Sequence, residues 1–391
     1  MCEKCSEPFR KLEGKKIVIG VTASISLYRV PDLVRDIVKQ GGSVVCAMSD
    51  SAQKLISPEI FRWASGNDPV TVITGKVEHI ALFSDPKNTV LVIVPATYNT
   101  LGKLATGISD EIPSLMFAYA FGHGVPVIVA PAMNEDMLRN PIMVDNIRRL
   151  SSLGVRFISP RIEDEKAKIS ENVSIIDEIY RSFNHSSMEG KRALVISGRS
   201  EEHIDPVRVI SNRSTGTTGY WLARNLYRLG ASHVTYIGNT NQPLPPYVNH
   251  IPADSTDDFY RETKAELRSD AYDIVFVPAA LSDFSVTSRD RKIESGKEVS
   301  IQLKPRKKLL DTIRTLHKGT LVSFKLGHDS SNLATTSPKE YMVFNAIRSE
   351  GRAFGDNTVE YRVFGSNGIQ DIVARGKEEA TWRLILHVAG E

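Results

Sequence analysis

Short apolar runs alternate along the chain with stretches of helical periodicity. Residues 15–21 form the first run and residues 44–48 form the next. Between them the apolar positions follow a helical pattern made of Leu27, Leu33, Val34, Ile37 and Val38. This pattern ends at the pair Gly41-Gly42. A strand, a helix and a second strand in this order predict a parallel pair with a right-handed crossover.

The same alternation continues through both halves of the chain. Further strands are predicted at residues 90–94, 125–130, 155–158, 192–196, 234–237, 274–277 and 321–324, with helical segments from Leu101, from Pro131 and near Gly219. Continuous apolar strands are typical of a sheet that helices cover on both faces. We therefore predict an α/β fold with two doubly wound, Rossmann-like domains.

The length of the chain agrees with two domains. Domains commonly contain about 100–200 residues, and this chain has 391. The short polar segment 184–189 separates the two series of strands, so we place a boundary there. The predicted domains are residues 1–185 and 186–391.

Composition excludes several classes of protein. The net charge of +3 is too small to indicate nucleic-acid or membrane binding, and no apolar run is long enough to span a bilayer. Residues 1–16 are charged and lack the apolar core of a signal peptide, so we expect a cytoplasmic protein. Cys2 and Cys5 provide only half of a four-cysteine zinc site and are interpreted as part of a loose terminal segment, whereas Cys46 is expected in a buried strand.

Small polar residues follow four successive strands of the first domain. They lie in residues 20–26, at Ser49 and Ser51, in residues 95–100 and in residues 131–134. Ligands of such sheets bind beyond the carboxyl ends of the strands, and phosphates favour helix N-termini. The residues alone leave a plain turn and a phosphate site equally open for residues 20–26.

The motifs GVTASIS (20–26), His79-Ile80, PATYNT (95–100) with Lys103, GISDEI (107–112) and PAMNEDM (131–137) occur in this order. They resemble the flavin-containing cysteine decarboxylases, specifically the phosphopantothenoylcysteine decarboxylases. The resemblance implies a flavodoxin-like domain that binds FMN. It places the cofactor near Gly20, Thr22, Ser24, Ile25, Ser49, Thr97, Asn99 and Met133.

The resemblance also implies catalytic roles. His79 would act as a base, since its ordinary pKa of about 6.5 suits proton transfer, and Asn134 would hold the substrate carboxylate. The implied reaction is oxidation of the substrate thiol by FMN, loss of carbon dioxide and return of the electrons. In one respect the chain departs from the family. Residues 159–169, where the family has a flap with a proton-donating cysteine, contain no cysteine, so Lys166, Lys168 or water would have to supply that proton.

A second set of motifs follows the strand at residues 192–196. Residues 204–216 read IDPVRVISNRSTG, followed by Gly219, residues 278–284 and Lys292. With residues 303–309, 324–325, 343–346 and 354–357 they resemble the phosphopantothenate–cysteine ligases. The resemblance implies that a nucleotide activates a carboxylate before an amine attacks it.

The roles in this second domain are implied by the same resemblance. Lys292 would stabilise charge on the α-phosphate, and Asn212 would hold the activated acyl group. Nucleotide-binding residues would be Ala279, Asp283, Lys292, Lys308, Phe324 and Lys325, with Arg306 and Lys307 near the phosphates and Mg²⁺ bound with the nucleotide. CTP is expected, with ATP as the alternative. Arg199, residues 326–328 and residues 345–346 depart from the family pattern near this pocket.

The expected protein is therefore a bifunctional enzyme of coenzyme A biosynthesis that uses 4′-phosphopantothenate, cysteine and CTP. The alternatives are a ligase with a degenerate flavin half and a non-catalytic flavoprotein. A dinucleotide oxidoreductase is disfavoured because no GxGxxG motif follows a strand. The family resemblance further implies a homo-oligomer, trimeric through the flavin domain and dimeric through the ligase domain.

Overall fold

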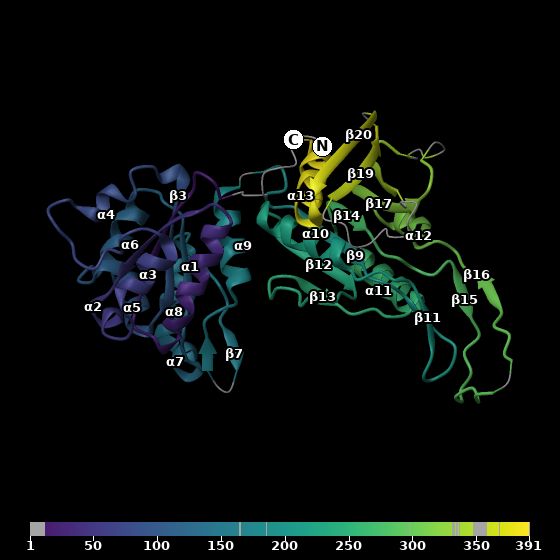
Figure 1. Cartoon of the computed structure of the whole chain (residues 1–391), viewed down its shortest axis with the longest axis horizontal. Helices are drawn as coiled ribbons and strands as arrows, with labels where there is room; N and C mark the ends of the chain where they lie inside the picture. The colour runs from purple at the N-terminus through teal and green to yellow at the C-terminus, as the bar shows by residue number, and fades with distance from the viewer. Residues whose placement is uncertain are drawn as a thin grey trace. The chain divides into compact units, whose positions relative to one another are not determined.

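The computed structural model describes residues 12–163, 166–184, 186–296, 298–330, 333, 335, 337–346, 358–366 and 368–390, and not the side chains of residues 162–168. The chain divides into two compact units, the first of which ends at Asn184 (Figure 1). Cys2, Cys5 and the motif at residues 354–357 lie outside the described residues.

The first unit is built on a five-stranded parallel sheet. Its strand order is β2-β1-β3-β4-β6, with β1 at Lys16–Val21, β2 at Ser43–Met48, β3 at Thr89–Ala96, β4 at Val127–Pro131 and β6 at Arg156–Phe157. This is the flavodoxin-like order, in which the chain reverses direction across the sheet between β1 and β3. The prediction of a doubly wound α/β domain is confirmed here.

Helices cover both faces of this sheet. They are η2 (Ile25–Arg29), α1 (Val30–Lys39), α2 (Asp50–Gln53), α3 (Pro58–Ser65), α4 (Glu78–Ala81), η3 (Pro86–Asn88), α5 (Tyr98–Thr106), α6 (Ile112–Gly122), α7 (Glu135–Arg139), α8 (Pro141–Ser152) and α9 (Asn172–Phe183). The core on one face joins α5, α6 and α8 to the strands. The segment expected as one helix through Val38 is instead a 3₁₀ turn followed by α1, since Pro31 lacks an N–H and suits a first turn.

A second, small sheet extends from the end of β4. Its strands are β5 (Met133–Asn134), β7 (Arg161–Glu163) and β8 (Lys166–Lys168), in the order β5-β8-β7. Met133 pairs with Ala167 and Asn134 pairs with Lys166, both antiparallel. The hairpin that lacks a cysteine is therefore hydrogen-bonded to the segment that carries Asn134.

The second unit contains an eight-stranded mixed sheet. Its order is β13-β12-β9-β14-β17-β18-β19-β20, with β9 at Arg192–Ser197, β12 at His233–Gly238, β13 at Asn249–Ile251, β14 at Ile274–Val277, β17 at Thr320–Gly327, β18 at Glu340–Ala346, β19 at Thr358–Gly365 and β20 at Gly368–Arg375. The first six strands are parallel and in Rossmann order, as predicted. Strands β19 and β20 instead add an antiparallel hairpin.

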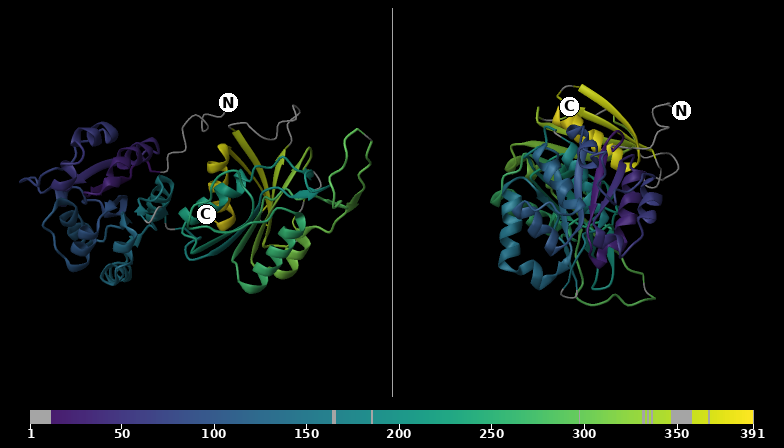
Figure 2. Two further views of the ribbon diagram at one scale, coloured as in Figure 1. Left: turned by 90° about the horizontal axis from the view of Figure 1, so that it is seen from below. Right: turned by 90° about the vertical axis from the view of Figure 1, so that its left-hand side faces the viewer.

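Two pairs of helices flank this sheet, α10 (Thr217–Arg228) with α13 (Gly376–Ala389) and α11 (Thr256–Ser269) with α12 (Leu309–Leu316) (Figure 2). Strands β10 (Glu201–His203) and β11 (Val209–Ser211) form one hairpin, and β15 (Phe284–Val286) and β16 (Leu303–Pro305) form another. The chain between β15 and β16 extends away from the body of the unit as an arm (Figure 1).

Candidate functional sites

The four polar loops of the first unit meet at the carboxyl edge of its sheet. The N–H of Ser49, after β2, donates to the oxygen of Val21 at 3.1 Å. The buried hydroxyl of Thr22, after β1, donates to the oxygen of Pro95 at 2.6 Å. These contacts join β1 to both of its neighbours, including β3 across the switch point, and therefore build one continuous edge.

The loop after β4 completes the same edge. The N–H of Ala132 donates to the oxygen of Ala96, at the end of β3, at 3.0 Å. Met133 is half-buried against the core at this point, and Asn99 is exposed on α5. The structure thus brings together the four loops that the sequence predicted to converge.

Each of these loops ends in a side chain that caps a helix. Ser24 caps η2, Ser49 caps α2, Thr97 caps α5 and Asn134 caps α7, and each side chain accepts an N–H from the first turn. Helix N-termini carry partial positive charge and unpaired N–H groups, which favours anions. The side chain of Ile25 lies next to this cluster and is 80% exposed, which provides an apolar surface. Hydroxyl groups, helix N-termini and an exposed apolar side chain fit a phosphate ester that carries a flat ring.

Gly20 has a packing role at this edge. A Cβ atom at this position would lie 2.5 Å from Cδ1 of Ile93, which is its partner in β3. Real Cβ atoms do not approach other atoms so closely, so a side chain here would require the terminal methyl group of Ile93 to move. Gly20 therefore leaves room for the side chain of Ile93 between β1 and β3.

Asn134 presents its amide group at the start of α7. Its Oδ1 atom accepts the N–H of Asp136 at 2.8 Å, which fixes the orientation of the side chain. Because the oxygen serves as the cap, the Nδ2 group is the part of this exposed side chain that is oriented to donate. An amide donor in this position suits a carboxylate.

His79 contacts the second half of α6. Its ring packs edge-on against Tyr119, with 5.9 Å between the centroids, and its Nδ1 atom is buried without a hydrogen-bond partner among the described residues. Pro113, at the start of α6, is instead the residue that approaches Gly20 at the carboxyl edge. The six helical residues from Pro113 to Tyr119 span about 9 Å, so His79 and Gly20 contact opposite ends of this helix.

The base of the small hairpin is fixed to η2. Arg29 donates to the oxygen of Ile169 at 3.3 Å and forms an ion pair with Glu171 at 3.0 Å. The hydroxyl of Ser170 donates to the oxygen of Ser159 at 2.6 Å and closes the hairpin at its base. These contacts link the hairpin to the helix that Ser24 caps.

The second unit has its own switch point, between β9 and β14. Arg199 forms an isolated parallel bridge with Ala280, and the N–H of Ala280 donates to the oxygen of Gly198 at 2.9 Å. The hydroxyl of Ser200 accepts the N–H of Ser282 at 2.8 Å. The loops that follow these two strands are therefore in direct contact, at the place where Rossmann-type sheets bind ligands.

Glycines allow a third loop to reach this point. Gly198 and Gly216 have φ values of 113° and 71°, and a Cβ atom on either would lie 2.4 Å from the oxygen of Asn239. Asn239 in turn accepts the N–H of Arg199 at 3.1 Å and donates to its oxygen at 2.9 Å. Asn239 was not among the predicted site residues, although it lies only two residues after the strand predicted at 234–237.

The other predicted nucleotide-binding residues lie near the same edge. Ala279 is in the loop after β14, whereas Phe324 and Lys325 lie within β17, past Ser323, which pairs with the last residue of β14. The oxygen of Asp283 accepts the N–H of Arg306 at 2.9 Å. Lys308 is exposed and forms the N-cap residue of α12.

The side chain of Arg306 forms ion pairs within the protein. Its guanidinium group contacts Glu202 at 3.2 Å and also pairs with Asp257, and the hydrogen bond that it donates to Asp257 is the main reason that its pKa is raised. Lys307 and Lys308 are accordingly the members of the basic run that remain on the surface. Glu202 and Asp257 were not predicted as partners of Arg306, because they are distant in sequence.

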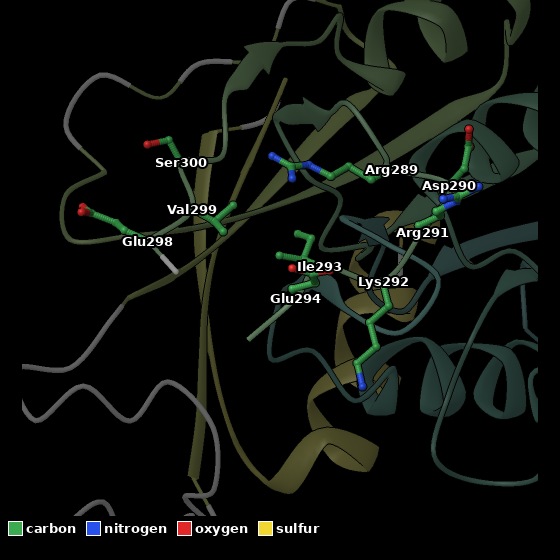
Figure 3. A pocket seen from close by; sticks show the side chains of 9 residues that line it. All are labelled: Arg289, Asp290, Arg291, Lys292, Ile293, Glu294, Glu298, Val299 and Ser300. Carbon is green, nitrogen blue, oxygen red and sulfur yellow. The ribbon is translucent and has the colours of Figure 1, made fainter. Parts of the chain in front are cut away.

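Lys292 is exposed on the arm between β15 and β16. An open pocket of about 780 Å³ is lined there by residues 289–294 and 298–300. Figure 3 shows the Lys292 side chain extended away from Glu298, Val299 and Ser300. Its neighbour Ile293 is hydrogen-bonded to the Ile204–Arg208 turn.

The described part of the chain contains no helix that is long and apolar enough to cross a membrane. Within these same ranges, no group of three or more histidine, cysteine, aspartate or glutamate side chains is arranged to hold a metal ion.

Both halves of the chain match known families. Residues 5–184 match the family described as Flavoprotein, and residues 188–390 match the DNA/pantothenate metabolism flavoprotein C-terminal domain. The fold and the two edge sites therefore define a flavoprotein unit followed by a Rossmann-type unit of pantothenate metabolism.

Curated relatives extend the match to nearly the whole chain. The coenzyme A biosynthesis bifunctional protein CoaBC of Thermococcus kodakarensis is 36% identical over 379 residues, which cover 95% of this chain and 91% of the relative. The protein of the same name from Methanocaldococcus jannaschii is 30% identical over 378 residues, covering 94% and 92%. A solved FMN-dependent cysteine decarboxylase, SpaF, is 28% identical with a TM-score of 0.38 and covers 42% of this chain and 94% of its own.

This chain belongs to the family of coenzyme A biosynthesis bifunctional proteins. The prediction of a bifunctional decarboxylase and ligase of coenzyme A biosynthesis is confirmed at the level of the family.

Proposed function

We propose that the second unit joins 4′-phosphopantothenate to cysteine with CTP, through an acyl-cytidylate, and that the first unit decarboxylates the product to 4′-phosphopantetheine with FMN. One observation carries most of this proposal. Each unit places a different set of polar groups at the switch point of its own parallel sheet, so one chain offers two separate sites.

In the ligase reaction, lysine side chains and Mg²⁺ stabilise the negative charge of the nucleotide phosphates. Lys292 stabilises the charge that develops on the α-phosphate, and Lys308 neutralises the outer phosphates together with Mg²⁺. Asn212, held against Ala280 at 2.9 Å, orients the acyl group for attack by the amine of cysteine. Because the described residues offer no acidic cluster, the metal would be held chiefly by the nucleotide.

In the decarboxylase reaction, FMN would be held at the edge formed by Thr22, Ser24, Ser49 and Thr97, and it would supply the oxidation and the later reduction of the sulfur compound. The hydroxyl groups and helix N-termini bind the phosphate, and Ile25 covers the apolar ring. Asn134 donates its amide hydrogens to the substrate carboxylate. The backbone pairing of Asn134 with the hairpin keeps the main chain of this residue in place.

The position of His79 supports a site shared between copies of the chain. Its ring contacts Tyr119, about 9 Å along α6 from the residue that approaches Gly20, and its buried Nδ1 atom has no hydrogen-bond partner among the described residues. We infer that a second copy brings its edge to this histidine, which then exchanges a proton with the substrate. This arrangement accords with a trimer of the first unit, to which the second unit adds a dimeric contact.

A second candidate is a ligase whose flavin half does not complete turnover. The absence of cysteine from residues 159–169 favours it, since a lysine with a pKa near 10.4 is a poor acid at neutral pH. The two candidates predict different end products.

The test is to incubate the purified chain with 4′-phosphopantothenate, cysteine, Mg²⁺ and CTP and to identify the products by mass spectrometry. CMP and 4′-phosphopantetheine would support both activities, whereas accumulation of phosphopantothenoylcysteine or an oxidised enethiol would support the second candidate. If neither CTP nor ATP is consumed, the ligase assignment is wrong. Lys292→Gln should reduce CMP formation to a small residual rate, and His79→Asn should stop the reaction at phosphopantothenoylcysteine.

A further inference from the structure

The segment that carries Lys292 is tied to a distant turn on both sides of the lysine. Before it, the N–H of Arg289 donates to the oxygen of Ile204 at 2.9 Å. After it, the N–H of Ile293 donates to Oδ2 of Asp205 at 3.0 Å. The main chain of the arm is therefore held in place at Arg289 and at Ile293, on both sides of Lys292.

The two oxygens of Asp205 have different partners. Oδ1 accepts the N–H groups of Val207 at 2.8 Å and of Arg208 at 2.9 Å, which stabilises the turn that contains Asp205. Oδ2 accepts the N–H of Ile293 and pairs with the guanidinium group of Arg208. Oδ1 thus stabilises the local turn, and Oδ2 binds the segment that contains Lys292.

Arg208 also binds the main chain of Ile293. Its Nη1 atom donates to the oxygen of Ile293 at 3.2 Å, so both main-chain polar groups of Ile293 are bound by the Asp205–Arg208 pair. The Asp205 side chain is completely buried, whereas the Arg208 side chain is 42% exposed. The N–H of Ile293 is the largest of the influences that hold the pKa of Asp205 well below its usual range, so the side chain is a carboxylate at working pH.

We propose that Asp205 is a positioning residue of the ligase reaction, which sets the place of Lys292 through the main chain of Ile293. This inference rests on the proposed ligase function. A flexible lysine on an extended arm can reach the α-phosphate in many ways, most of them unproductive. Anchoring the residue that follows it restricts where the Nζ atom can lie and lowers the cost of reaching the productive geometry.

The substitution Asp205→Asn tests the long-range bond selectively. The asparagine oxygen can keep the bonds of the local turn, while its NH₂ group would face the N–H of Ile293 and the guanidinium group, both of which are donors. We expect the kcat for CMP release to fall about 10- to 100-fold, because a misplaced catalytic group costs rate. The KM for CTP should change by less than about threefold, because the bond acts on the transition state more than on ground-state binding.

Asp273→Asn is the matched control. Asp273 also accepts a main-chain N–H from a distant residue, that of Arg192, at 2.8 Å, but at the amino end of the same sheet. It should lose a comparable bond without a change in kcat. Unfolding of both variants should be followed by the fluorescence of the three tryptophans, so that a loss of fold is recognised.

The decisive measurement is a double-mutant cycle with Lys292→Gln. If Asp205 acts through Lys292, Asp205→Asn should have no further effect on the residual CMP formation of the Lys292→Gln chain. If the effect persists in full, Asp205 has only a general structural role and the inference is wrong. Should Asp205→Asn fail to fold, Arg208→Lys replaces it, since this exposed side chain would lose the bond to Ile293 and should show the same dependence on Lys292. An unaltered kcat in a folded variant would also overturn the inference, whereas an inactive unmodified chain would overturn the proposed function instead.

Discussion

The Nδ2 atom of Asn212 donates a hydrogen bond to the main-chain oxygen of Ala280 at 2.9 Å. Asn212 directly follows β11 and Ala280 follows β14, so the bond joins two loops that lie on either side of the switch point of the second unit. The amide is exposed, and its orientation is set by this contact.

Replacing Asn212 with aspartate should strongly impair ligation. The carboxylate cannot donate to the oxygen of Ala280 and repels it, so we expect kcat/KM for CMP formation to fall at least about tenfold, which corresponds to 1.4 kcal/mol. Asn249→Asp is the control, because Asn249 donates to Thr235 over 3.4 Å at the edge strand β13. A folded Asn212→Asp chain with unchanged kcat/KM would contradict the assigned role.

Thr22→Val should destabilise the first unit and weaken its cofactor site. Valine has nearly the same shape but leaves the buried oxygen of Pro95 without its donor, which costs about 1–3 kcal/mol. The midpoint of urea unfolding and the FMN retained after purification should both decrease. Thr106→Val removes an exposed hydroxyl bond to the oxygen of Gly102 and should leave both quantities nearly unchanged. Equal effects of the two substitutions would refute the prediction.

The stability of the second unit should depend on His317 in mildly acidic solution. Burial lowers the pKa of His317 below its usual value of 6.5, and its Nε2 atom contacts the oxygen of Thr320 at 3.1 Å. The unfolded chain therefore binds a proton at a higher pH than the folded chain. The contribution of neutral His317 to the free energy of unfolding is fully present above about pH 6.5. It decreases as the pH falls from there towards the lower pKa of the folded state.

The measurement is the free energy of urea unfolding between pH 7.5 and 5.5, followed by tryptophan fluorescence in a chain in which Trp63 of the first unit is replaced by phenylalanine. The decrease should be smaller in His317→Gln than in the unmodified chain, whereas His328→Gln, which changes an exposed histidine, should follow the unmodified chain. Parallel pH profiles for all three proteins would show that His317 does not carry the effect.

Mixing two inactive variants should restore decarboxylation. His79→Asn and Asn134→Ala would each disable a different part of a site that two copies share, so mixed oligomers contain some sites with both original residues. After the two chains are unfolded and refolded together, 4′-phosphopantetheine formation from phosphopantothenoylcysteine should exceed that of either variant alone. No recovery, despite mixed oligomers in mass spectrometry, would indicate that both residues act within one chain.

The strand ends of both units could be predicted from sequence. Buried parallel strands appear as continuous apolar runs, and the residues directly after them, such as Thr22 and Thr97, lie at the carboxyl edge by topology alone. The hairpin of β19 and β20 was not predicted. The residues of β19 largely alternate between buried and exposed positions, unlike the continuous apolar runs by which the other strands were predicted. The antiparallel pairing of β19 with β18 has no local signal in the sequence.

Long-range contacts were the other part that the sequence did not reveal. The turn around Asp205 has a local signal, since an aspartate before proline commonly accepts N–H groups two and three residues on. Its bond to Ile293 has none, because no periodicity relates the two positions. The placement of His79 on Tyr119 likewise depends on how α4 packs against α6. The two-residue strand β5 is too short to show any alternation.

The carboxyl edge of the first unit also has a consequence for the order of folding. Val21 with Ser49, Thr22 with Pro95, and Ala96 with Ala132 are all pairs that lie far apart along the chain. Such non-local contacts form late, because closing each loop costs entropy before the contact is gained. A growing chain that has not yet reached residue 132 cannot form the whole edge. Flavin binding would therefore report completed folding of this unit during synthesis, and not an early intermediate.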